Sequence, residues 1–201
     1  MVTVMSSEAP KPRRGRPITT DPNSVSLAAL KLFDQRGIEA VTMDEVAAVA
    51  GISRSNLFRL FPSKAAVVWG GIHQFKDELA KQLHSSDNQE LISLLHRAWV
   101  EAMHVLDESL EMLRLRLKLI GSSPEVYGWG QGQLDDVRKL MEQAVIDSGG
   151  DSLRAKMVSS AMVSASMAML IHWAEQGDPR TPSQFLDDGF TDLEALFSRV
   201  G

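Results

Sequence analysis

The 201-residue sequence contains no cysteine. Disulfide bonds, thiolate metal sites and thiol catalysis are therefore excluded, and a reducing cytoplasm is the compartment that this composition favours. The N-terminus begins with polar and basic residues and has no apolar run, so we expect no signal peptide. No stretch alternates as a β-strand does, and apolar residues recur at helical spacing instead, which predicts an all-α fold.

Motifs of known enzyme classes are also scarce, because the sequence has no nucleophile elbow and no phosphate-binding loop. Glu101 and His104 have the Glu-x-x-His spacing of a di-iron helical bundle, and His172 and Glu175 form a second pair on one helix face. Such a centre needs two Glu-x-x-His motifs and two further inward glutamates, and only one motif runs in that direction. Exposed or capping residues are the better interpretation, so we expect no enzyme, no metal and no cofactor.

The formal net charge of −5 at pH 7 argues by itself against a nucleic-acid partner, but the charges are unevenly distributed. Residues 1–70 contain nine basic and six acidic residues, a net charge of +3, whereas the remaining residues contain twelve and twenty, a net charge of −8. A basic N-terminal third on an acidic remainder is expected of a protein that meets phosphate with one end only.

Residues 42–64 read as two short helices joined by a glycine turn. Thr42 and Glu45 have capping-box spacing, and Gly51 lies where the chain must reverse. Ser53 can cap a second helix that continues to Leu60. The inward residues expected for the two helices are Val46, Ala47, Val49, Ala50, Leu57 and Leu60. This pattern predicts a helix-turn-helix.

The outward face of the second helix predicts contact with DNA. The side chains that point away from its apolar side are those of Arg54, Ser55, Asn56 and Arg59. In the major groove arginine pairs with guanine and asparagine with adenine. Lys64, in the first turn of the next helix, can bind a phosphate together with free N–H groups. A helical corner with merely solvated polar residues is the alternative, and the agreement of caps, turn and polar face favours DNA.

The segment resembles the DNA-binding domain of the TetR family of one-component transcription regulators. The matching residues are Thr42, Glu45, Val46, Ala47, Gly51, Ser53, Leu57, Phe58, Phe61, Pro62, Ser63 and Lys64. The resemblance covers about residues 22–69 and implies that Thr42, Ser53, Phe58, Phe61 and Lys64 also lie at the DNA interface. Family members often have a phosphate-binding tyrosine at the positions of Phe58 and Phe61. Phenylalanine lacks that hydroxyl, and Phe58 can instead pack on the DNA backbone.

Residues 1–20 read as a disordered basic arm, because they are rich in proline, serine, threonine and basic residues and have no period. The run Arg14-Gly15-Arg16-Pro17 resembles an AT-hook, in which two arginines enter a narrow A·T minor groove. A generic basic tail that aids non-specific binding is the equally weighted alternative.

The apolar pattern predicts about nine helices in two folded domains. We expect a helix-turn-helix domain over residues 21–70 and a helical ligand-binding and dimerisation domain over residues 71–201. One continuous helix is expected over residues 63–84 and another over residues 124–147, the second weakened near its start by three glycines.

Residues 157–174 contain no charged residue, a length that reaches the membrane-spanning threshold. Serines and many alanines argue against a membrane span, and no membrane partner is expected. A helix that is apolar all round should be buried on all sides. We expect it to pack on its own domain on one side and on a second copy on the other, as the TetR resemblance also implies for the last two helices. A dimer would read two half-sites of an inverted-repeat operator.

A separate helical domain attached to a DNA reader suggests a ligand sensor. Candidate residues for an apolar pocket are Trp99, Met103, Met112, Leu115, Tyr127, Trp129, Met162, Met169 and Trp173. For any single one of them an ordinary core position is the better interpretation. The Trp69-Gly70-Gly71 run and residues 113–120 resemble the TetR subgroup typified by the mycofactocin-system regulator. That resemblance implies a small apolar or acyl-type effector, such as an acyl-CoA.

Arg114, Arg116 and Lys118 could meet an anionic head group, although alternating charges on a helix more often form a solvated face. The sequence thus predicts a homodimeric regulator that binds a double-stranded operator, represses from the cytoplasm and is released by an effector. The alternatives are a DNA-binding or architectural protein without an effector and, less favoured, a bundle metalloenzyme.

Overall fold

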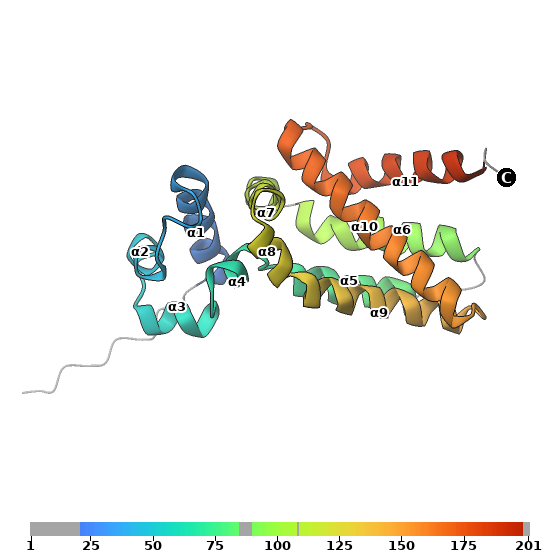
Figure 1. The fold of residues 1–201 in the computed structure, drawn as a ribbon, viewed down its shortest axis with the longest axis horizontal. Coiled ribbons are helices and arrows are strands. Elements are labelled where there is room, and N and C mark those ends of the chain that lie inside the picture. Colours follow the sequence, from blue (N-terminus) through green and yellow to red (C-terminus); the bar gives the residue numbers. More distant parts are fainter. Residues whose placement is uncertain (1–20, 85–89, 108, 199–201) are drawn as a thin grey trace, which may run out of the picture.

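The computed structural model describes residues 21–84, 90–107 and 109–198, and these form helices joined by short connections (Figure 1). In chain order the helices are α1 (Pro22–Arg36), α2 (Met43–Val49), α3 (Arg54–Leu60), α4 (Lys64–Val68), α5 (Ile72–His84), α6 (Leu91–Asp107), α7 (Leu110–Ser122), α8 (Pro124–Trp129), α9 (Gln131–Asp147), α10 (Ser152–Gln176) and α11 (Pro182–Ser198). The all-α prediction is confirmed.

Helices α1 to α4 form one end of the molecule, which we call the head, and α5 to α11 form the body (Figure 1). Each helix of the head begins at a side-chain cap: Asp21, Thr42, Ser53 and Ser63 accept from backbone N–H groups of α1, α2, α3 and α4. Gly37, with φ of +81°, ends α1 in a conformation that favours glycine. The helix boundaries of the head therefore follow from local sequence.

The apolar core is continuous from head to body, and its head portion lies between α1 and the helix-turn-helix. Its fully buried side chains include those of Ala29, Leu30, Phe33, Val46 and Leu57. Val49 was expected among them but is 57% exposed. Helical residues follow one another by about 100°, which sets Val49 about 110° from the centre of the face formed by Val46, Ala47 and Ala50. Helix α2 packs on α1 and α3, and Val49 lies outside the face that it buries.

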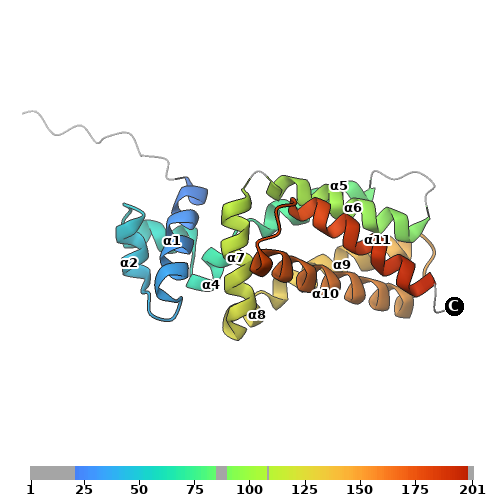
Figure 2. The same cartoon turned by 90° about the horizontal axis from the view of Figure 1, so that it is seen from above.

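The body is a bundle in which α5 packs on α6, α9 on α10, and α11 on α6 and α10. Helix α7 crosses between the bundle and the head; it is seen end-on in Figure 1 and lengthwise in Figure 2. It contacts α1 and α4 on one side and α10 on the other. Any change in the bundle that moves α7 therefore acts directly on the head.

Two helices expected to be continuous are broken, which makes eleven helices rather than about nine in the described residues. The helix predicted over residues 63–84 stops at Val68, and Gly71 adopts φ of +91° before α5 begins. The helix predicted over residues 124–147 is split at Gly130, against which the Trp69 ring packs. Both breaks lie where the head meets the body, and both serve contacts between residues far apart in the sequence.

Helix α10 is long and apolar enough to pass a composition test for crossing a membrane, with a mean hydropathy of 1.3. A core helix of a globular bundle passes the same test, and α10 packs on α7, α9 and α11. Its outward side carries Leu153 and Met157, which are 69% and 64% exposed in the single chain. This uncovered apolar face of α10 is a surface on which the expected second copy could pack.

Candidate nucleic-acid interface and effector cavity

Two interlocking caps fix the orientation of the helix-turn-helix. The Thr42 N–H donates to Glu45 Oε2 at 2.8 Å, and the Glu45 N–H donates to Thr42 Oγ1 at 3.3 Å. The Thr42 hydroxyl also donates to Glu45 Oε2 at 2.8 Å. The two bonds from Thr42 to the carboxylate, with a 2.8 Å ion pair from Arg36, lower the pKa of Glu45 to about 2. At the start of α3, Ser53 Oγ accepts from the Asn56 N–H at 3.3 Å. The start of α3 is thus fixed by the Ser53 cap, just as the start of α2 is fixed by the Thr42–Glu45 capping box.

The outward face of α3 is open to solvent. Ser53, Arg54, Ser55, Phe58 and Arg59 are all exposed, and Asn56 is half-buried. Arg54 forms a 2.8 Å ion pair with Asp44 and lies over the Phe58 ring at 5.3 Å. Both partners of that pair are well exposed, so DNA can exchange for Asp44 at little cost. Arg59 has no ion pair within the described part of the chain.

Two of the predicted interface residues serve the head internally. Phe61 is 8% exposed and belongs to the core, because the chain turns inward at the end of α3. Lys64 Nζ donates to the Ile38 carbonyl oxygen at 2.7 Å and so closes the loop after α1. Thr42 is exposed and keeps an accessible position beside α3. Arg14 and Arg16 lie outside the described residues.

The body encloses an apolar cavity of about 80 Å³ beneath α7. Its walls come from the α4–α5 junction and from α5, α6, α7, α9 and α10, through Val68, Trp69, Gly70, Gly71, Ile72, Phe75, Trp99, Met103, Leu106, Leu113, Arg116, Leu117, Ile120, Leu134, Val137, Met167 and Leu170. Almost every lining group is hydrocarbon, with the Arg116 guanidinium as the one charged exception. The cavity is therefore lined almost entirely by apolar groups, with the Arg116 cation at its edge.

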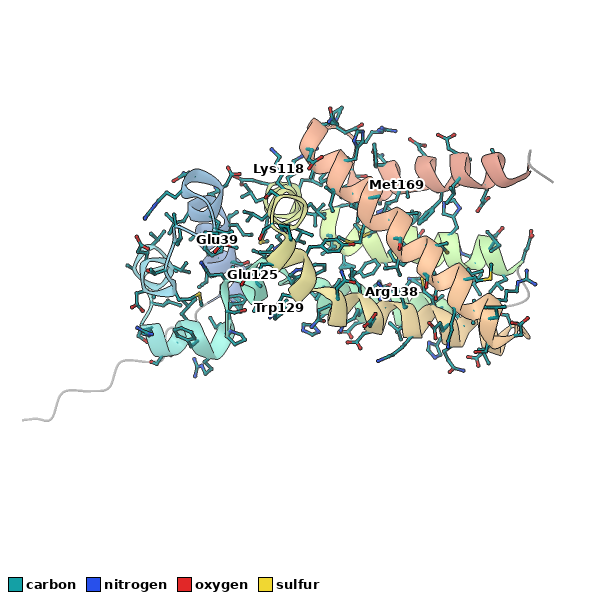
Figure 3. All side chains as sticks on the ribbon, in the orientation of Figure 1. Glu39, Lys118, Glu125, Trp129, Arg138 and Met169 are labelled. Atoms are coloured by element: carbon teal, nitrogen blue, oxygen red, sulfur yellow. The ribbon has the colours of Figure 1, made fainter. Side chains whose placement is uncertain are left out.

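Of the residues predicted to line an effector pocket, Trp99 and Met103 border this cavity. Met112, Leu115, Met162, Met169 and Trp173 pack elsewhere in the body, and Met169 lies against Gly189. Tyr127 and Trp129 are 38% and 43% exposed, because the six-residue α8 buries only Val126 (Figure 3 labels Trp129). The hydrophobic character of a residue therefore does not predict whether it lines the cavity, because the lining is determined by where α7 crosses the bundle.

The three basic residues of α7 have three different surroundings. The Arg114 guanidinium lies 3.8 Å from the centre of the Trp173 ring and donates to the carbonyl oxygens of Trp173 and Asp178. Lys118 is exposed at the side of the hollow between head and body, near Glu39 and Glu125 (Figure 3). Arg116 is 7% exposed. Of the three, Arg116 alone borders the apolar cavity, and only Lys118 is exposed as a solvated face would be.

The residues considered for a metal centre are not gathered into one. Glu101 and His104 are exposed on α6, and His104 Nδ1 lies 3.0 Å from Asp107. His172 and Glu175 are exposed on α10. Within the described ranges no group of three or more histidine or carboxylate side chains could hold a metal ion.

Comparison with known proteins identifies both parts of the chain. Residues 27–68 match the family model "Bacterial regulatory proteins, tetR family", and residues 89–198 match the model "MftR C-terminal domain". The mycofactocin biosynthesis transcriptional regulator MftR of Mycobacterium tuberculosis is 29% identical over 165 residues, which cover 80% of this chain and 83% of that protein.

Solved structures share the fold. The TetR-family repressor FadR of Thermus thermophilus, in complex with lauroyl-CoA, superposes with a TM-score of 0.54 at 17% identity and covers 85% of this chain and 92% of that one. The fatty acid degradation regulator FadR of Bacillus halodurans gives a TM-score of 0.64 at 12% identity with the same coverages. The chain belongs to the TetR family of DNA-binding transcription regulators, not to an enzyme family, and its body is a domain of the MftR type.

Proposed function

We propose that the protein is a homodimeric repressor that binds an inverted-repeat operator through α3 and is released by a small apolar or acyl-type effector. The observation that carries the DNA-binding part is the open face of α3. Arg54, Ser55 and Arg59 project from a helix whose start is fixed by Ser53, at the end of the molecule remote from the bundle (Figure 1). A helix whose backbone is already fixed can present these side chains to base edges without first being ordered.

The proposed interface consists of Thr42, Ser53, Arg54, Ser55, Asn56, Phe58 and Arg59, with Lys64 supporting the loop that presents them. The basic arm, with Arg14 and Arg16, adds contacts to phosphate or to the minor groove. Phe61 is left out because its ring is in the core.

Dimerisation is proposed because one seven-residue recognition helix contacts too few bases to select a site in a genome. A two-fold dimer places two such helices about one DNA turn apart, roughly 34–36 Å. The uncovered apolar side of α10, with Leu153 and Met157, supports a bundle of α10 and α11 from two copies as the interface. Such a regulator works in the cytoplasm, where bacterial DNA lies.

An effector is proposed because an apolar cavity lies between the bundle and α7, the helix that contacts the head. The Thermus FadR with this fold was solved with lauroyl-CoA, which supports an acyl-type ligand here as well. The cavity of about 80 Å³ is far below the ~300–1,000 Å³ of typical ligand sites. A ligand must therefore widen it, and the difference between its affinities for the released form and for the operator-binding form sets the extent of induction.

The test is recovery of bound chromosomal fragments with the full chain, followed by titration of the recovered inverted repeat at moderate salt. A variant with Arg54→Ala and Arg59→Ala is the control, since both side chains are exposed and their loss leaves the core intact. Recovery of the same fragments by this control, or no preference for any inverted repeat, would contradict the proposal.

A further inference from the structure

The Arg116 guanidinium is a buried cation that has no counter-ion among the described residues. The side chain is 7% exposed, and no carboxylate within the described part of the chain forms an ion pair with it. Its partners are neutral: Nη2 donates to Ser26 Oγ at 2.8 Å and approaches Met112 Sδ at 3.4 Å. Burial lowers its pKa to about 10, so the group stays charged at neutral pH. A charge kept from water normally has an anion beside it.

The backbone around Arg116 makes room for the guanidinium. A Cβ on Gly70 would lie 2.9 Å from Arg116 Nη2, and one on Gly71 would lie 2.6 Å from Nη1. The break between α4 and α5 therefore holds a planar cation that a side chain at either position would displace. On one side of this position lies the apolar cavity, and on the other a surface hollow lined by Asn23, Ser26, Gly71 and others.

Two residues that line this cavity each carry a buried hydrogen-bond donor without an acceptor in the described part of the chain. Arg116 Nε and Trp99 Nε1 are both inaccessible to solvent and have no partner in the described structure. Arg116 and Trp99 both line the apolar cavity, whose other walls offer few acceptors. An unsatisfied buried donor costs about 1–3 kcal/mol, so a ligand that brings an acceptor gains from each. A negatively charged acceptor gains most, because Arg116 is charged.

Arg116 also connects the body to the head. Ser26 lies on α1 and, besides accepting from Arg116, donates to the Val67 carbonyl oxygen of α4 at 3.2 Å. A carboxylate or phosphate that pairs side-on with arginine uses Nε and one terminal nitrogen. Here Nε is unoccupied and Nη2 is bonded to Ser26. An anion bound in this way competes directly with the head for the same guanidinium edge.

We propose that Arg116 binds the anionic end of an amphiphilic effector whose apolar chain widens the cavity, and that this pairing takes Nη2 from Ser26 and loosens the head. The proposal rests on the effector-responsive function above and names its ligand class. The anion is a carboxylate or a phosphate, so a free fatty acid and an acyl-CoA are its two sources. Met103 and Met167 in the lining provide the adaptable walls that such widening needs.

The experiment measures binding of dodecanoate, dodecanoyl-CoA and uncharged dodecanol to the full chain by calorimetry and by fluorescence of Trp69 and Trp99, which line the cavity. Wild type is expected to prefer an anionic probe over dodecanol by about tenfold or more. Arg116→Gln should abolish that preference, and Arg116→Lys, which keeps the charge without the side-on pair of nitrogens, should retain part of it. The matched control is Lys118→Gln, an exposed cation two residues along α7, which should change nothing.

Ser26→Ala tests the competition. It removes the rival acceptor and should tighten the favoured anionic probe several-fold while leaving dodecanol unchanged; a general loosening would affect both. An Arg116→Gln or Arg116→Lys protein with the full wild-type anion preference, or a wild type that binds none of the probes, overturns the inference. Operator titration without any probe is run for every protein, so a failure of the DNA-binding function is seen separately.

Discussion

Trp69 packs tightly against Gly130 where the head meets the body, and the coupling between the two residues can be measured. Trp69 caps the end of α4, is 5% exposed, and donates from Nε1 to the Val126 carbonyl oxygen at 2.8 Å. A Cβ on Gly130 would overlap atoms of the six-membered ring of that indole. Gly130 has φ of −75°, which suits any residue, so only the Trp69 ring requires glycine there.

Gly130→Ala should therefore destabilise the fold through overpacking by about 1–3 kcal/mol, although alanine is the better helix former. Gly128→Ala is the matched control, because no atom lies within 4 Å of a Cβ at that position. The control should be neutral or stabilising by up to about 1 kcal/mol. Trp69→Phe removes the outer ring atoms, so in that background Gly130→Ala should behave like the control.

The assay is urea unfolding of the two single variants and the double variant, followed by circular dichroism at one protomer concentration, because dimer stability depends on concentration. We expect a coupling free energy of about 1.5–3 kcal/mol, with the double variant more stable than the sum of the single effects predicts. Additive effects within about 0.5 kcal/mol would refute the contact as the reason for the glycine.

Three further predictions concern the head and the dimer. Arg59→Ala should weaken operator binding roughly 5- to 150-fold in a fluorescence anisotropy titration while leaving the melting temperature unchanged. The hydrogen bonds from Thr42 lower the pKa of Glu45 to about 2 in the folded head. The ionised carboxylate therefore stabilises the head above the ordinary glutamate pKa, and this stabilisation is lost as the pH falls towards 2. Glu45→Gln should flatten that acid limb in thermal melts between pH 5 and 2, and an unchanged limb would contradict the assignment. Leu153→Lys with Met157→Lys should convert the protein to a folded monomer in light scattering, because two ammonium groups would replace the uncovered apolar side of α10.

The head, apart from the end of α4 and the burial of Val49, could be predicted from sequence because its structure is set within a few residues. Thr42, Ser53 and Ser63 cap their helices through groups three positions away, and Gly51 reverses the chain with φ of +66°. These are local interactions, and helix propensity, capping and turn chemistry all favour the same helix boundaries. Val49 was misplaced because a short helix buries a narrower face than its apolar residues suggest.

The cavity could not be predicted in the same way, because it is made by residues distant in sequence. Ser26 and Arg116 are 90 positions apart, and Trp69 and Val126 are 57 apart. Arg116 lies in an alternating run of charges that looks like a solvated face, and only the packing of α7 on α1 buries it. The pair Gly70-Gly71 was the available signal, since two glycines inside an expected helix indicate a break or a close approach.

The connection between head and body also limits how an effector can act. Three contacts connect the head to the body. They are the hydrogen bond from the Trp69 indole to Val126, the hydrogen bond from Arg116 to Ser26, and the ion pair between Lys31 and Glu111 at 2.9 Å. The ion pair is exposed and contributes little, and the indole is fixed by packing on Gly130. Of these three contacts, the bond from Arg116 to Ser26 is therefore the one that is both buried and open to competition by a charged ligand. A ligand that leaves this bond intact should occupy the cavity and still leave the operator bound, which makes dodecanol a test of binding without release.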